Sequence, residues 1–593
     1  MLRRPILRFL ILAGICWLAL TPFFKWGIAS GHDFEFHMYS WMEVLSQWKQ
    51  GVAYPRWAEL AHWGYGEARF IFYPPASWTL GAVLGAILPW KMVPGAYCWI
   101  VLTGTGISMY ALARWWLQPP DALFAATFYA LNPYHLLIVY WRSAYAELLA
   151  AVIVPLMVLC MVRLREEGFR PTLWLSLTLA GAWLTNDPAA LVIYYSAAGL
   201  AVVMAVRERS ARPLVKTAIA MVVGAGLASF YLLPAIYEQS WVSIAQVLSP
   251  GVRPQDNFLF TTLADPDHNR FNLLVSWLAV AEIAILALAI WYSRPARFEK
   301  GRLEQVRFEK NAWTLVAVWG AAAAFVMLPM SNLLWEYLPK FRFVQLPFRW
   351  LLCLNASLAI LLAMATQESC PLQPITSQES GSPRSIAQSA TFRSAIRRWT
   401  TRGLVPSILL VVLLLAGHRI QPPWWDNSGD IAEMEDAISD GTGYDGTDEY
   451  VPVGADPSEV KKDLAPVSSS SGSAGSVHML EWDATAKHFV AHTDRAQKLT
   501  VRLFNYPAWK VLVNGKPTAT QTTDITGLMV IPVSAGENDV HIYFARTPDR
   551  LAGGIVSLIS ILVFGVAWIM TERKPRPPNC TRNFTRNFTR AEV

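Results

Sequence analysis

The sequence predicts a mainly α-helical, polytopic membrane protein that also carries a small antiparallel β-sandwich domain near its C-terminal end. Of its 593 residues, 54% are hydrophobic and only 16% are charged, whereas a soluble protein carries about 25% charged residues. Apolar runs of roughly 20 residues, the length needed to cross a bilayer, recur along the chain. Strand-like runs, by contrast, gather in one late segment, residues 477–548.

The apolar runs predict about twelve transmembrane helices. These helices are expected at residues 6–26, 93–113, 119–139, 146–163, 172–186, 188–206, 214–233, 273–292, 312–329, 348–366, 403–418 and 552–571. The chain contains 27 Trp and 20 Tyr residues, and many of them stand near the ends of these runs, as expected at membrane–water interfaces.

The basic residues predict the orientation of the chain in the membrane. Segments rich in Arg and Lys stay in the cytoplasm. Four such segments lie between predicted crossings: 163–171, 206–216, 293–311 and 367–402. The parity of the crossings then places both termini in the cytoplasm, with the basic tail 573–593, and exports the loops 28–92 and 419–551. The net charge of +7 therefore reflects orientation and does not indicate nucleic-acid binding.

The first exported loop is expected to contain two helices that do not cross the membrane. Residues 34–49 form an amphipathic helix that lies in the interface, because apolar residues recur at helical spacing, and Gly51 ends it. The stretch 76–90 (ASWTLGAVLGAILPW) is too short for a full crossing and is bounded by prolines. It is predicted to be a juxtamembrane or half-inserted helix on the outer face.

The last third of the chain divides into segments of different composition. Residues 367–402 are rich in Ser, Gln and Arg and read as a disordered loop. Residues 419–476 form an acidic and Ser-rich exported linker. The β domain at 477–548 follows, and the helix at 552–571 tethers it to the membrane.

Sequence patterns within the β domain predict its strands and one of its turns. Leu499, Val501 and Leu503 alternate with polar residues, which is the period of a half-buried strand. The pair Asn514-Gly515 is a strong signal for a two-residue hairpin. Trp482 and Trp509 are predicted to anchor the core because both lie in strand-like runs.

The most informative polar residues follow the first predicted crossing directly, in the stretch SGHDFEFHMYS. Asp33 is the predicted catalytic base. Its alternative role is the N-cap of helix 34–49, since Asp is favoured at that position. His32, Glu35 and His37 are predicted to contact substrate. His32, Asp33 and His37 could instead hold a divalent metal ion, although they do not make a compact ligand set of high specificity.

Two further exported turns place ionisable groups near membrane depth. In NPYHLLIVYWRSAYAELLA, Arg142 and Glu147 either snorkel to the interface and start a helix or mark a substrate site. In LTNDPAALV, Asn186-Asp187-Pro188 is a good turn and helix start, which is the favoured interpretation. Asp187 is nonetheless a predicted substrate contact.

Basic residues in the exported segment YLPKFRFVQLPFRWLLC oppose the positive-inside rule and therefore indicate an anionic partner. Arg342 and Arg349 are predicted to face the same cavity as Asp33 and to bind a lipid phosphate or pyrophosphate through their forked guanidinium groups. Gln345 in this segment and Arg56 in the first exported loop are predicted substrate contacts as well.

Together these residues would suit a group transfer whose donor carries a phosphate leaving group. A carboxylate takes the proton of the acceptor, and the guanidinium groups stabilise the charge on the departing phosphate. The sequence contains no Gly-rich phosphate-binding loop and no Ser-His-Asp signature. This argues against ATP or a nucleotide sugar as the donor.

Several stretches resemble a known family. GHDFEFHMYSWMEVLSQWKQGVAYPRW, GYGEARFIFYPP, NPYHLLIVYWRSAYAELLA and FRFVQLPFRW resemble the bacterial membrane proteins called 6-pyruvoyl-tetrahydropterin synthase-related. GTDEYVP and FNYPAWKVLVNGK are similar to the same proteins and to membrane glycosyltransferases that decorate lipoteichoic acid. The resemblance covers most of the chain except residues 367–402 and 573–593.

The resemblance implies a GT-C-type architecture for residues 1–366, in which an Asp or Glu of the first exported loop acts on polyprenyl-phosphate sugars. That carboxylate maps to Asp33. The family's name implies a pterin enzyme, but the sequence has no zinc-binding His triad to match. The chain departs from the expected Thr-His pair by having Asn186-Asp187, which leaves the role of that turn open.

The leading hypothesis is a glycosyltransferase of the bacterial inner (cytoplasmic) membrane. It would move a sugar from a polyprenyl-phosphate carrier to an envelope glycan or protein acceptor. Two alternatives stay open: a lipid-linked glycan carrier or flippase, and a non-catalytic envelope-assembly protein whose β domain binds a partner. A carrier needs charged groups deep within its helices, and Glu282 is one of few such residues.

Overall fold

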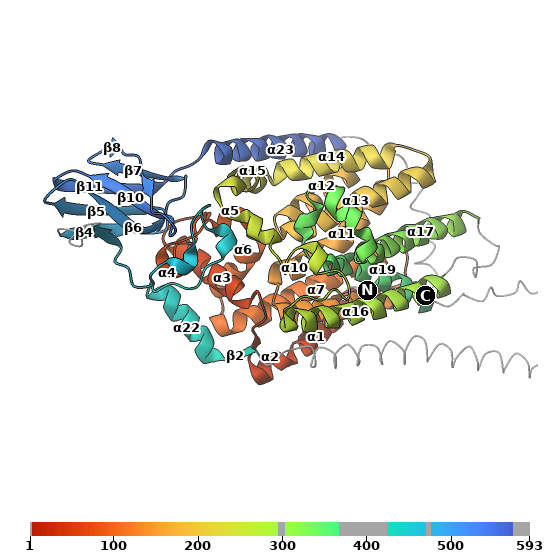
Figure 1. Ribbon diagram of the computed structural model, residues 1–593. Coiled ribbons are helices and arrows are strands. Elements are labelled where there is room, and N and C mark those ends of the chain that lie inside the picture. Colours follow the sequence, from red (N-terminus) through yellow and green to blue (C-terminus); the bar gives the residue numbers. More distant parts are fainter. Residues whose placement is uncertain (1–2, 294–302, 367–423, 470–475, 573–593) are drawn as a thin grey trace, which may run out of the picture.

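A computed structural model of the chain describes residues 3–293, 303–366, 424–469 and 476–572. Helices make up most of the molecule, and two β-sheets extend from one end of the helical bundle (Figure 1). Three predicted features lie outside the described residues, namely the disordered loop 367–402, the crossing at 403–418 and the basic tail 573–593.

The α-helices of the first half are α1 (Arg3–Ala19), α2 (Thr21–Trp26), α3 (Phe34–Lys49), α4 (Ala61–Gly64), α5 (Arg69–Phe72), α6 (Pro75–Gly85), α7 (Val93–Ala113), α8 (Pro119–Ala130), α9 (Pro133–Leu137), α10 (Tyr145–Ala150), α11 (Ile153–Arg163), α12 (Arg170–Trp183), α13 (Asp187–Glu208), α14 (Arg212–Leu227) and α15 (Ser229–Glu238). Those of the second half are α16 (Pro266–Tyr292), α17 (Leu303–Val326), α18 (Asn332–Tyr337), α19 (Leu351–Thr366), α22 (Ser428–Ser439) and α23 (Pro548–Glu572). Short 3-10 and π-helical turns connect several of them.

Seven helical stretches of the described chain are long and apolar enough to cross a membrane, and nine if each of two bent pairs counts as one span. The last of them, Pro548–Thr571, has only 11% of its most apolar window buried inside the protein. Large side chains such as Leu562 and Ile561 are more than half exposed on it. An apolar surface of this extent needs lipid to cover it, so the chain is an integral membrane protein.

Some predicted crossings differ from the helices that occupy them. In place of 6–26, the chain has α1 and α2 with a break between them. In place of 172–186 it has α12, whose 14 residues extend about 21 Å, less than the bilayer core. Residues 212–241 and 312–337 form the two bent pairs, with bends of 77° and 94°. The count of about twelve crossings stays a prediction.

The first exported loop forms the helices that were predicted for it. Helix α3 matches the predicted helix 34–49 and is followed by Gly51, whose φ is +89°. Helix α6 has 11 residues, which confirms that this stretch is too short to cross. The apolar face of α3 packs against protein rather than lipid, because Trp41 is fully buried and stacks on Tyr97 with ring centroids 4.9 Å apart.

The strands form two antiparallel sheets and one short strand pair. The strands are β1 (Ile28–Ala29), β2 (Trp425–Asp426), β3 (Val467–Ser469), β4 (Val477–Trp482), β5 (Ala486–Thr493), β6 (Gln497–Phe504), β7 (Trp509–Val513), β8 (Lys516–Pro517), β9 (Gln521–Thr522), β10 (Leu528–Val533) and β11 (Gly536–Phe544). The sheets have the orders β3-β6-β10-β9 and β4-β5-β11-β7-β8, and β1 pairs with β2. Side chains of both sheets share one hydrophobic core, so the predicted antiparallel β region is confirmed, but β3 belongs to it and lies in the segment 419–476 that was predicted to be a linker.

The predicted hairpin and one of the two predicted anchors are also confirmed. Asn514 and Gly515 connect β7 to β8 and have φ values of +51° and +75°, as a two-residue turn with this twist requires. Trp509 is 3% exposed and lies in the shared core. Trp482 is only partly buried at the edge of that core, because it ends the outermost strand β4.

Buried polar contacts fasten the β-sheets to the helical bundle. Lys487 of β5 pairs with Glu59 of the first loop at 2.6 Å, and both side chains are mostly buried. Glu238, at the end of α15, accepts a hydrogen bond from Tyr506 at 2.6 Å and a bidentate pair from Arg550 of α23 at 2.7 Å. The sheets are therefore held by specific partners as well as by the final helix.

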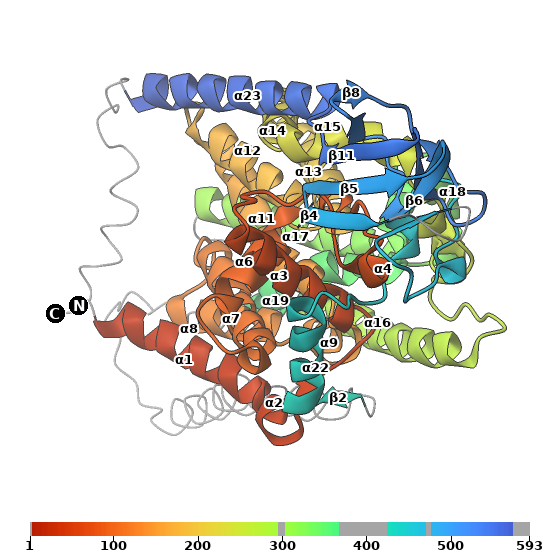
Figure 2. The ribbon, with the colours of Figure 1, turned by 90° about the vertical axis from the view of Figure 1, so that its left-hand side faces the viewer.

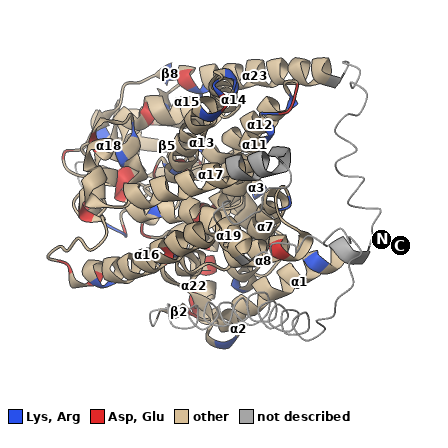
Figure 3. Cartoon of the chain, turned by 90° about the vertical axis from the view of Figure 1, so that its right-hand side faces the viewer, with Lys and Arg blue, Asp and Glu red and all other residues tan. Residues whose placement is uncertain are grey.

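Two of the basic loops that were predicted to be cytoplasmic lie together. The turn between α13 and α14 is at the end of the bundle away from the β-sheets (Figure 1), the end onto which Figure 3 looks. The loop between α11 and α12 contacts it, since Arg165 pairs with Glu208 at 2.5 Å and Lys216 donates to the Leu164 carbonyl at 2.8 Å. This arrangement fits the predicted sidedness, which itself stays a prediction.

Candidate active site

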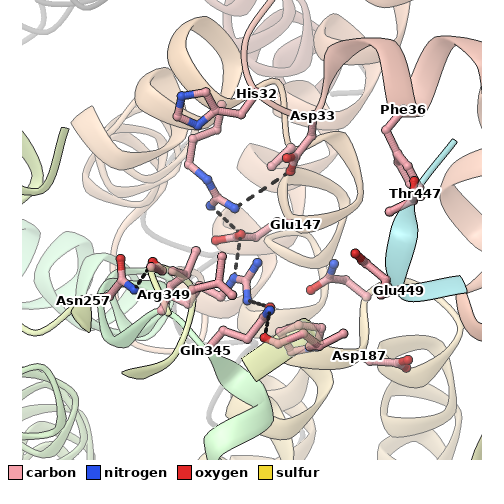
Figure 4. A pocket seen from close by; sticks show the side chains of 18 of the residues that line it. His32, Asp33, Phe36, Glu147, Asp187, Asn257, Gln345, Arg349, Thr447 and Glu449 are labelled. Carbon is pink, nitrogen blue, oxygen red and sulfur yellow. Dashed lines mark hydrogen bonds and ion pairs between the residues drawn. The ribbon is translucent and has the colours of Figure 1, made fainter. Parts of the chain in front are cut away.

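A cavity of about 970 Å³ lies where turns from distant parts of the chain meet. Seven of the predicted site residues line it: His32, Asp33, Arg142, Glu147, Asp187, Gln345 and Arg349. Figure 4 shows most of them pointing toward one another. Apolar and aromatic walls, which include Trp141 and Tyr73, complete the lining. Polar groups that converge on an otherwise apolar cavity are typical of a ligand site.

Glu147 holds two arginines of the cavity in place. Its Oε2 accepts from Arg142 Nη1 at 2.6 Å and from Arg349 Nε at 3.1 Å. Tyr134 donates to its other oxygen. Glu147 is 1% exposed, whereas its two arginine partners each retain a few per cent of exposure toward the cavity. We call these three residues the Arg142–Glu147–Arg349 cluster. Two guanidinium groups share the Glu147 carboxylate, so the cluster of three carries a net charge of +1, with the Asp33 carboxylate 4.0 Å from Arg142.

The backbone on either side of Arg142 explains its position. Residues Ile138–Arg142 form a π-helical turn, and Ser143 then adopts a left-handed conformation with φ +49°. Turns of this kind often occur at functional sites. The carboxylate of Glu147, in the first turn of α10, lies five residues further along the chain and is brought back toward Arg142 by this change of direction.

Asp33 is fixed against the same turn through its backbone. Its N–H donates to the Arg142 carbonyl at 2.9 Å, and Gly31 N–H donates to Ser143 Oγ at 2.9 Å. Asp33 occupies the N-cap position of α3, yet its side chain makes no capping hydrogen bond. The N-cap interpretation of this carboxylate is therefore wrong. Its Oδ2 lies 4.0 Å from Arg142 Nη2, and the side chain is 44% exposed.

Arg349 is oriented by the segment that precedes it. Its Nη1 donates to the Val344 carbonyl at 2.7 Å and to Gln345 Oε1 at 2.9 Å. Gln345 has a φ of +63° and donates from its amide to the Val247 carbonyl at 2.8 Å. This amide thus positions the guanidinium group from one side while Glu147 positions it from the other.

The Asn186-Asp187 turn starts a helix and also borders the cavity. Asn186 caps α13 by accepting from the Ala189 N–H at 3.0 Å. Asp187 lines the cavity, and its Oδ2 accepts from Tyr231 at 2.6 Å. Its buried Oδ1 has no hydrogen-bond partner among the described residues. The predicted turn and helix start are confirmed, and the substrate contact of Asp187 stays a prediction.

Four predicted substrate contacts lie outside the cavity lining. His37 is 1% exposed among the rings of Trp41 and Tyr145, and burial lowers its pKa to about 3. Arg56 lies over the Tyr54 ring and donates to the Phe230 carbonyl at 3.4 Å. The side chains of Glu35 and Arg342 are exposed.

The proposed metal set of His32, Asp33 and His37 does not come together in the described structure. His32 faces the cavity, while His37 points from α3 into the aromatic core. Asp33 and His37 are four residues apart, but they do not share a helix face. Asp33 precedes the helix, and its side chain follows the loop toward Arg142.

Part of the cavity wall comes from a segment that sequence reasoning did not assign to the site. Thr447 and Glu449 line the cavity (Figure 4). The Thr447 N–H donates to Glu67 at 2.6 Å, and Glu67 pairs with Arg69 at 2.5 Å. Burial and the charge of Glu67 raise the pKa of Glu449 to about 7. The only sequence signal was the stretch GTDEYVP, which the family resemblance had already singled out.

Comparisons with known proteins identify no family for this chain. No protein-family model matches it, and no curated protein sequence matches it significantly. The resemblance to 6-pyruvoyl-tetrahydropterin synthase-related proteins therefore has no support from these comparisons.

Solved structures do show a distant likeness. The archaeal oligosaccharyltransferase AglB from Archaeoglobus fulgidus, in complex with an inhibitory peptide and a dolichol-phosphate, is 11% identical with a TM-score of 0.40, over 74% of this chain and 56% of that chain. ArnT from Cupriavidus metallidurans in the apo state is 13% identical with a TM-score of 0.38, over 74% of each chain. The chain thus spans just over half of the AglB structure, and the likeness assigns no activity to it.

Proposed function

We propose that this protein is a membrane glycosyltransferase that moves a sugar from a polyprenyl-phosphate carrier to a cell-envelope acceptor on the extracytoplasmic face. One observation carries the proposal. The carboxylate of Asp33 is free of any capping role and stands 4.0 Å from Arg142 at the edge of the cavity. A base and a cation are thus placed side by side where both can meet one ligand.

The cationic side of the cavity suits the phosphate of the donor. Arg142 Nη2 lies 4.0 Å from Asp33 Oδ2, beyond direct hydrogen-bond distance, so this nitrogen has a donor to offer a ligand. The Arg142–Glu147–Arg349 cluster carries a net charge of +1 in a mostly buried setting, with Asp33 as a more distant carboxylate at 4.0 Å from Arg142. A charge-assisted hydrogen bond from these guanidinium groups to phosphate is strong in such a setting. Fixing both arginines in advance also reduces the entropy lost on binding.

The proposed transfer is a single displacement. The acceptor hydroxyl gives its proton to Asp33, and its oxygen forms a bond to the anomeric carbon of the donor sugar. The bond from that carbon to the phosphate oxygen breaks, and the carrier phosphate leaves with the electron pair. Arg142 and Arg349 stabilise the charge that develops on it. Attack from the side opposite the leaving group inverts the anomeric centre.

The remaining wall of the cavity suits a sugar. Asp187 and Glu449 both line the cavity and bring two carboxyl groups to it. Carboxylates accept hydrogen bonds from sugar hydroxyl groups, and the rings of Tyr73 and Phe36 in the same wall give the apolar faces of a sugar a surface on which to pack. Figure 4 shows Asp187 and Glu449 to one side of Arg349.

A transfer assay in detergent or nanodiscs with polyprenyl-phosphate sugars tests the proposal. We expect Asp33→Asn to lower the transfer rate by about 10²–10⁴-fold, the usual loss when a general base is removed, with the melting temperature unchanged. Glu35→Gln is the matched control, because Glu35 is an exposed carboxylate two residues away that does not line the cavity.

Two outcomes would reject the mechanism. Full activity of Asp33→Asn would remove its base. Tight binding of the lipid-linked sugar by the native chain, without transfer to any envelope acceptor, would instead favour the alternative of a lipid-linked glycan carrier.

A further inference from the structure

Three potential metal ligands meet on the outer face of the five-stranded sheet, far along the chain from the cavity. His488 of β5 and His541 of β11 are direct cross-strand partners. Asp539 precedes His541 by two residues on β11, so both side chains lie on the same face of the sheet. Figure 2 shows β4, β5 and β11 at the front of the molecule, seen from the β-sheet end.

The geometry brings one atom of each side chain into a small space. His488 Nε2 lies 2.6 Å from Asp539 Oδ1, and His541 Nε2 lies 3.9 Å from Asp539 Oδ2. The two imidazole rings stack with centroids 3.5 Å apart and an interplanar angle of 25°. The three ligand atoms all lie within 4.8 Å of one another, and no other group of three such side chains does so in the described part of the chain.

An ion pair alone accounts for only part of this arrangement. A hydrogen bond between His488 and Asp539 explains the contact at 2.6 Å, but it does not explain why His541 stacks on His488 and brings its Nε2 to 3.9 Å from the same carboxylate. Two imidazole nitrogens and one carboxylate oxygen that converge on one small space are a typical ligand set for a divalent transition-metal ion.

We propose that His488, Asp539 and His541 form a binding site for a divalent transition-metal ion, with zinc as the representative. Two imidazole nitrogens and one carboxylate oxygen suit zinc, whereas calcium and magnesium prefer oxygen ligands alone. Tetrahedral zinc ligands at about 2.0–2.1 Å from the ion stand about 3.3–3.4 Å apart. The separations of 2.6 and 3.9 Å lie on either side of this value, so small side-chain rotations produce the site.

The position of the site suggests what the metal would do. An ion held by His488 and by two residues of β11 links neighbouring strands of the sheet, and it stabilises the folded domain in proportion to its binding. Three protein ligands leave one position of a tetrahedral ion open. His488 is 21% exposed and His541 is 47% exposed, so that position faces solvent and is accessible to water or to a ligand from outside.

Zinc binding by the full chain tests the site. The protein is purified in detergent without a polyhistidine tag, stripped with EDTA and dialysed against zinc chloride. The bound zinc is then measured by mass spectrometry. Replacing a residue that only supports a metal ligand typically weakens metal binding by roughly 10–100-fold. We expect His488→Ala, His541→Ala and Asp539→Asn, which remove the ligands themselves, each to weaken zinc binding at the site by more than this. Zinc should also raise the melting temperature of the native chain but not of these three variants.

The same sheet supplies matched controls. His478 and His492 are exposed histidines on β4 and β5 outside the group, and His478→Ala and His492→Ala should retain the site. Equal melting temperatures in EDTA show that all variants fold. Zinc binding that is absent in the native chain, or unchanged in the His488 and His541 variants, would overturn the proposal. So would binding that is lost on replacing His32 instead.

Discussion

Among the individual residues of the cavity, Glu147 decides how the charges are arranged. It is buried, and it accepts hydrogen bonds from both Arg142 and Arg349, which would otherwise be two uncompensated cations in one cavity. A buried ion pair of this kind contributes little net stability, but it fixes geometry, and removing one partner is costly. The consequence for function is that the two guanidinium groups are rigid before any ligand binds.

Arg349 should depend on its forked shape as well as on its charge. Lys in its place keeps the charge but cannot contact Glu147, Gln345 and a phosphate at once. We expect Arg349→Lys to raise the KM for the lipid-phosphate donor by about tenfold or more, the loss of one charge-assisted hydrogen bond. Steady-state kinetics at fixed acceptor concentration measures this value.

A neighbouring arginine provides the control for that substitution. Arg342 lies in the same segment, but its side chain is exposed and outside the cavity lining. Arg342→Lys should leave the KM for the donor unchanged. An equal effect of both substitutions would show that general surface charge, rather than the cluster, binds the donor.

At the scale of elements, the crossing of the first exported loop over the π-helical turn sets the distance between Asp33 and Arg142. A Cβ added at Gly31 would lie 2.1 Å from the Trp141 carbonyl oxygen. Because the obstructing atom belongs to the backbone, one of the two elements must move. The small residue at position 31 is therefore a requirement of the site.

We expect Gly31→Ala to destabilise the protein by about 1–3 kcal/mol, as overpacking usually does, and to lower the transfer rate together with stability. Thermal unfolding in detergent and the transfer assay measure the two effects. Gly14→Ala in α1 is the control, since no atom lies within 4 Å of its added Cβ and Ala favours a helix. A native-like Gly31→Ala variant would disprove the tight crossing.

The contact between α3 and the segment that follows α22 should make stability depend on pH. Glu43 is 1% exposed and accepts a hydrogen bond from Tyr444 at 2.5 Å. Burial, partly offset by that hydrogen bond and by Arg69, raises the pKa of Glu43 from 4.5 to about 7. The folded state thus holds this proton more tightly than the unfolded state does.

The sign of the effect follows from proton linkage. The stabilising contribution of Glu43 is fully present below about pH 4.5 and is lost as the pH rises through about 7. Since one unit of pKa shift corresponds to about 1.4 kcal/mol, the free energy of unfolding falls by at most about 3 kcal/mol over this range. We expect Glu43→Gln to flatten this part of the stability profile, as measured by chemical unfolding between pH 5 and 8. Parallel profiles for both proteins would contradict the assignment.

For the whole molecule, the structure separates two ends. The turns that build the cavity lie toward the β-sheets, and the basic loops around Arg165 and Lys216 lie at the other end. A donor embedded in the membrane and an acceptor in the envelope can meet only if the cavity end is exported. The proposed function therefore requires the predicted sidedness, and a cavity that opens to the cytoplasm would contradict both.

Cysteine labelling tests this sidedness. Ala211 in the α13–α14 turn and Ala519 after the β7–β8 hairpin are both exposed. In a background without the six native cysteines, we expect Ala519→Cys to react with an impermeant maleimide in spheroplasts. Ala211→Cys should react only after permeabilisation. The reverse pattern would place the cavity in the cytoplasm and exclude the proposed donor geometry.

The sequence by itself determined the features that depend on local pattern. Runs of apolar residues identified the membrane helices, because a bilayer demands a fixed length of apolar chain. Alternation over residues 499–503 and the pair Asn514-Gly515 identified a strand and a hairpin, since side chains alternate along strands and only certain residues adopt positive φ. Seven of the predicted site residues line one cavity, and most of them were singled out because ionisable groups at membrane depth are rare; their roles stay predictions.

Only the tertiary structure decided which of these charges meet. Glu147 and Arg349 are 202 positions apart, and no local pattern links them. Helical periodicity could show that α3 has a buried face, but not that His37 would be enclosed by Tyr145 from another helix. The wall formed by Thr447 and Glu449 likewise depends on how a distant segment docks. Ion pairs and cavities arise from packing between elements, and a single sequence records only the pattern within each.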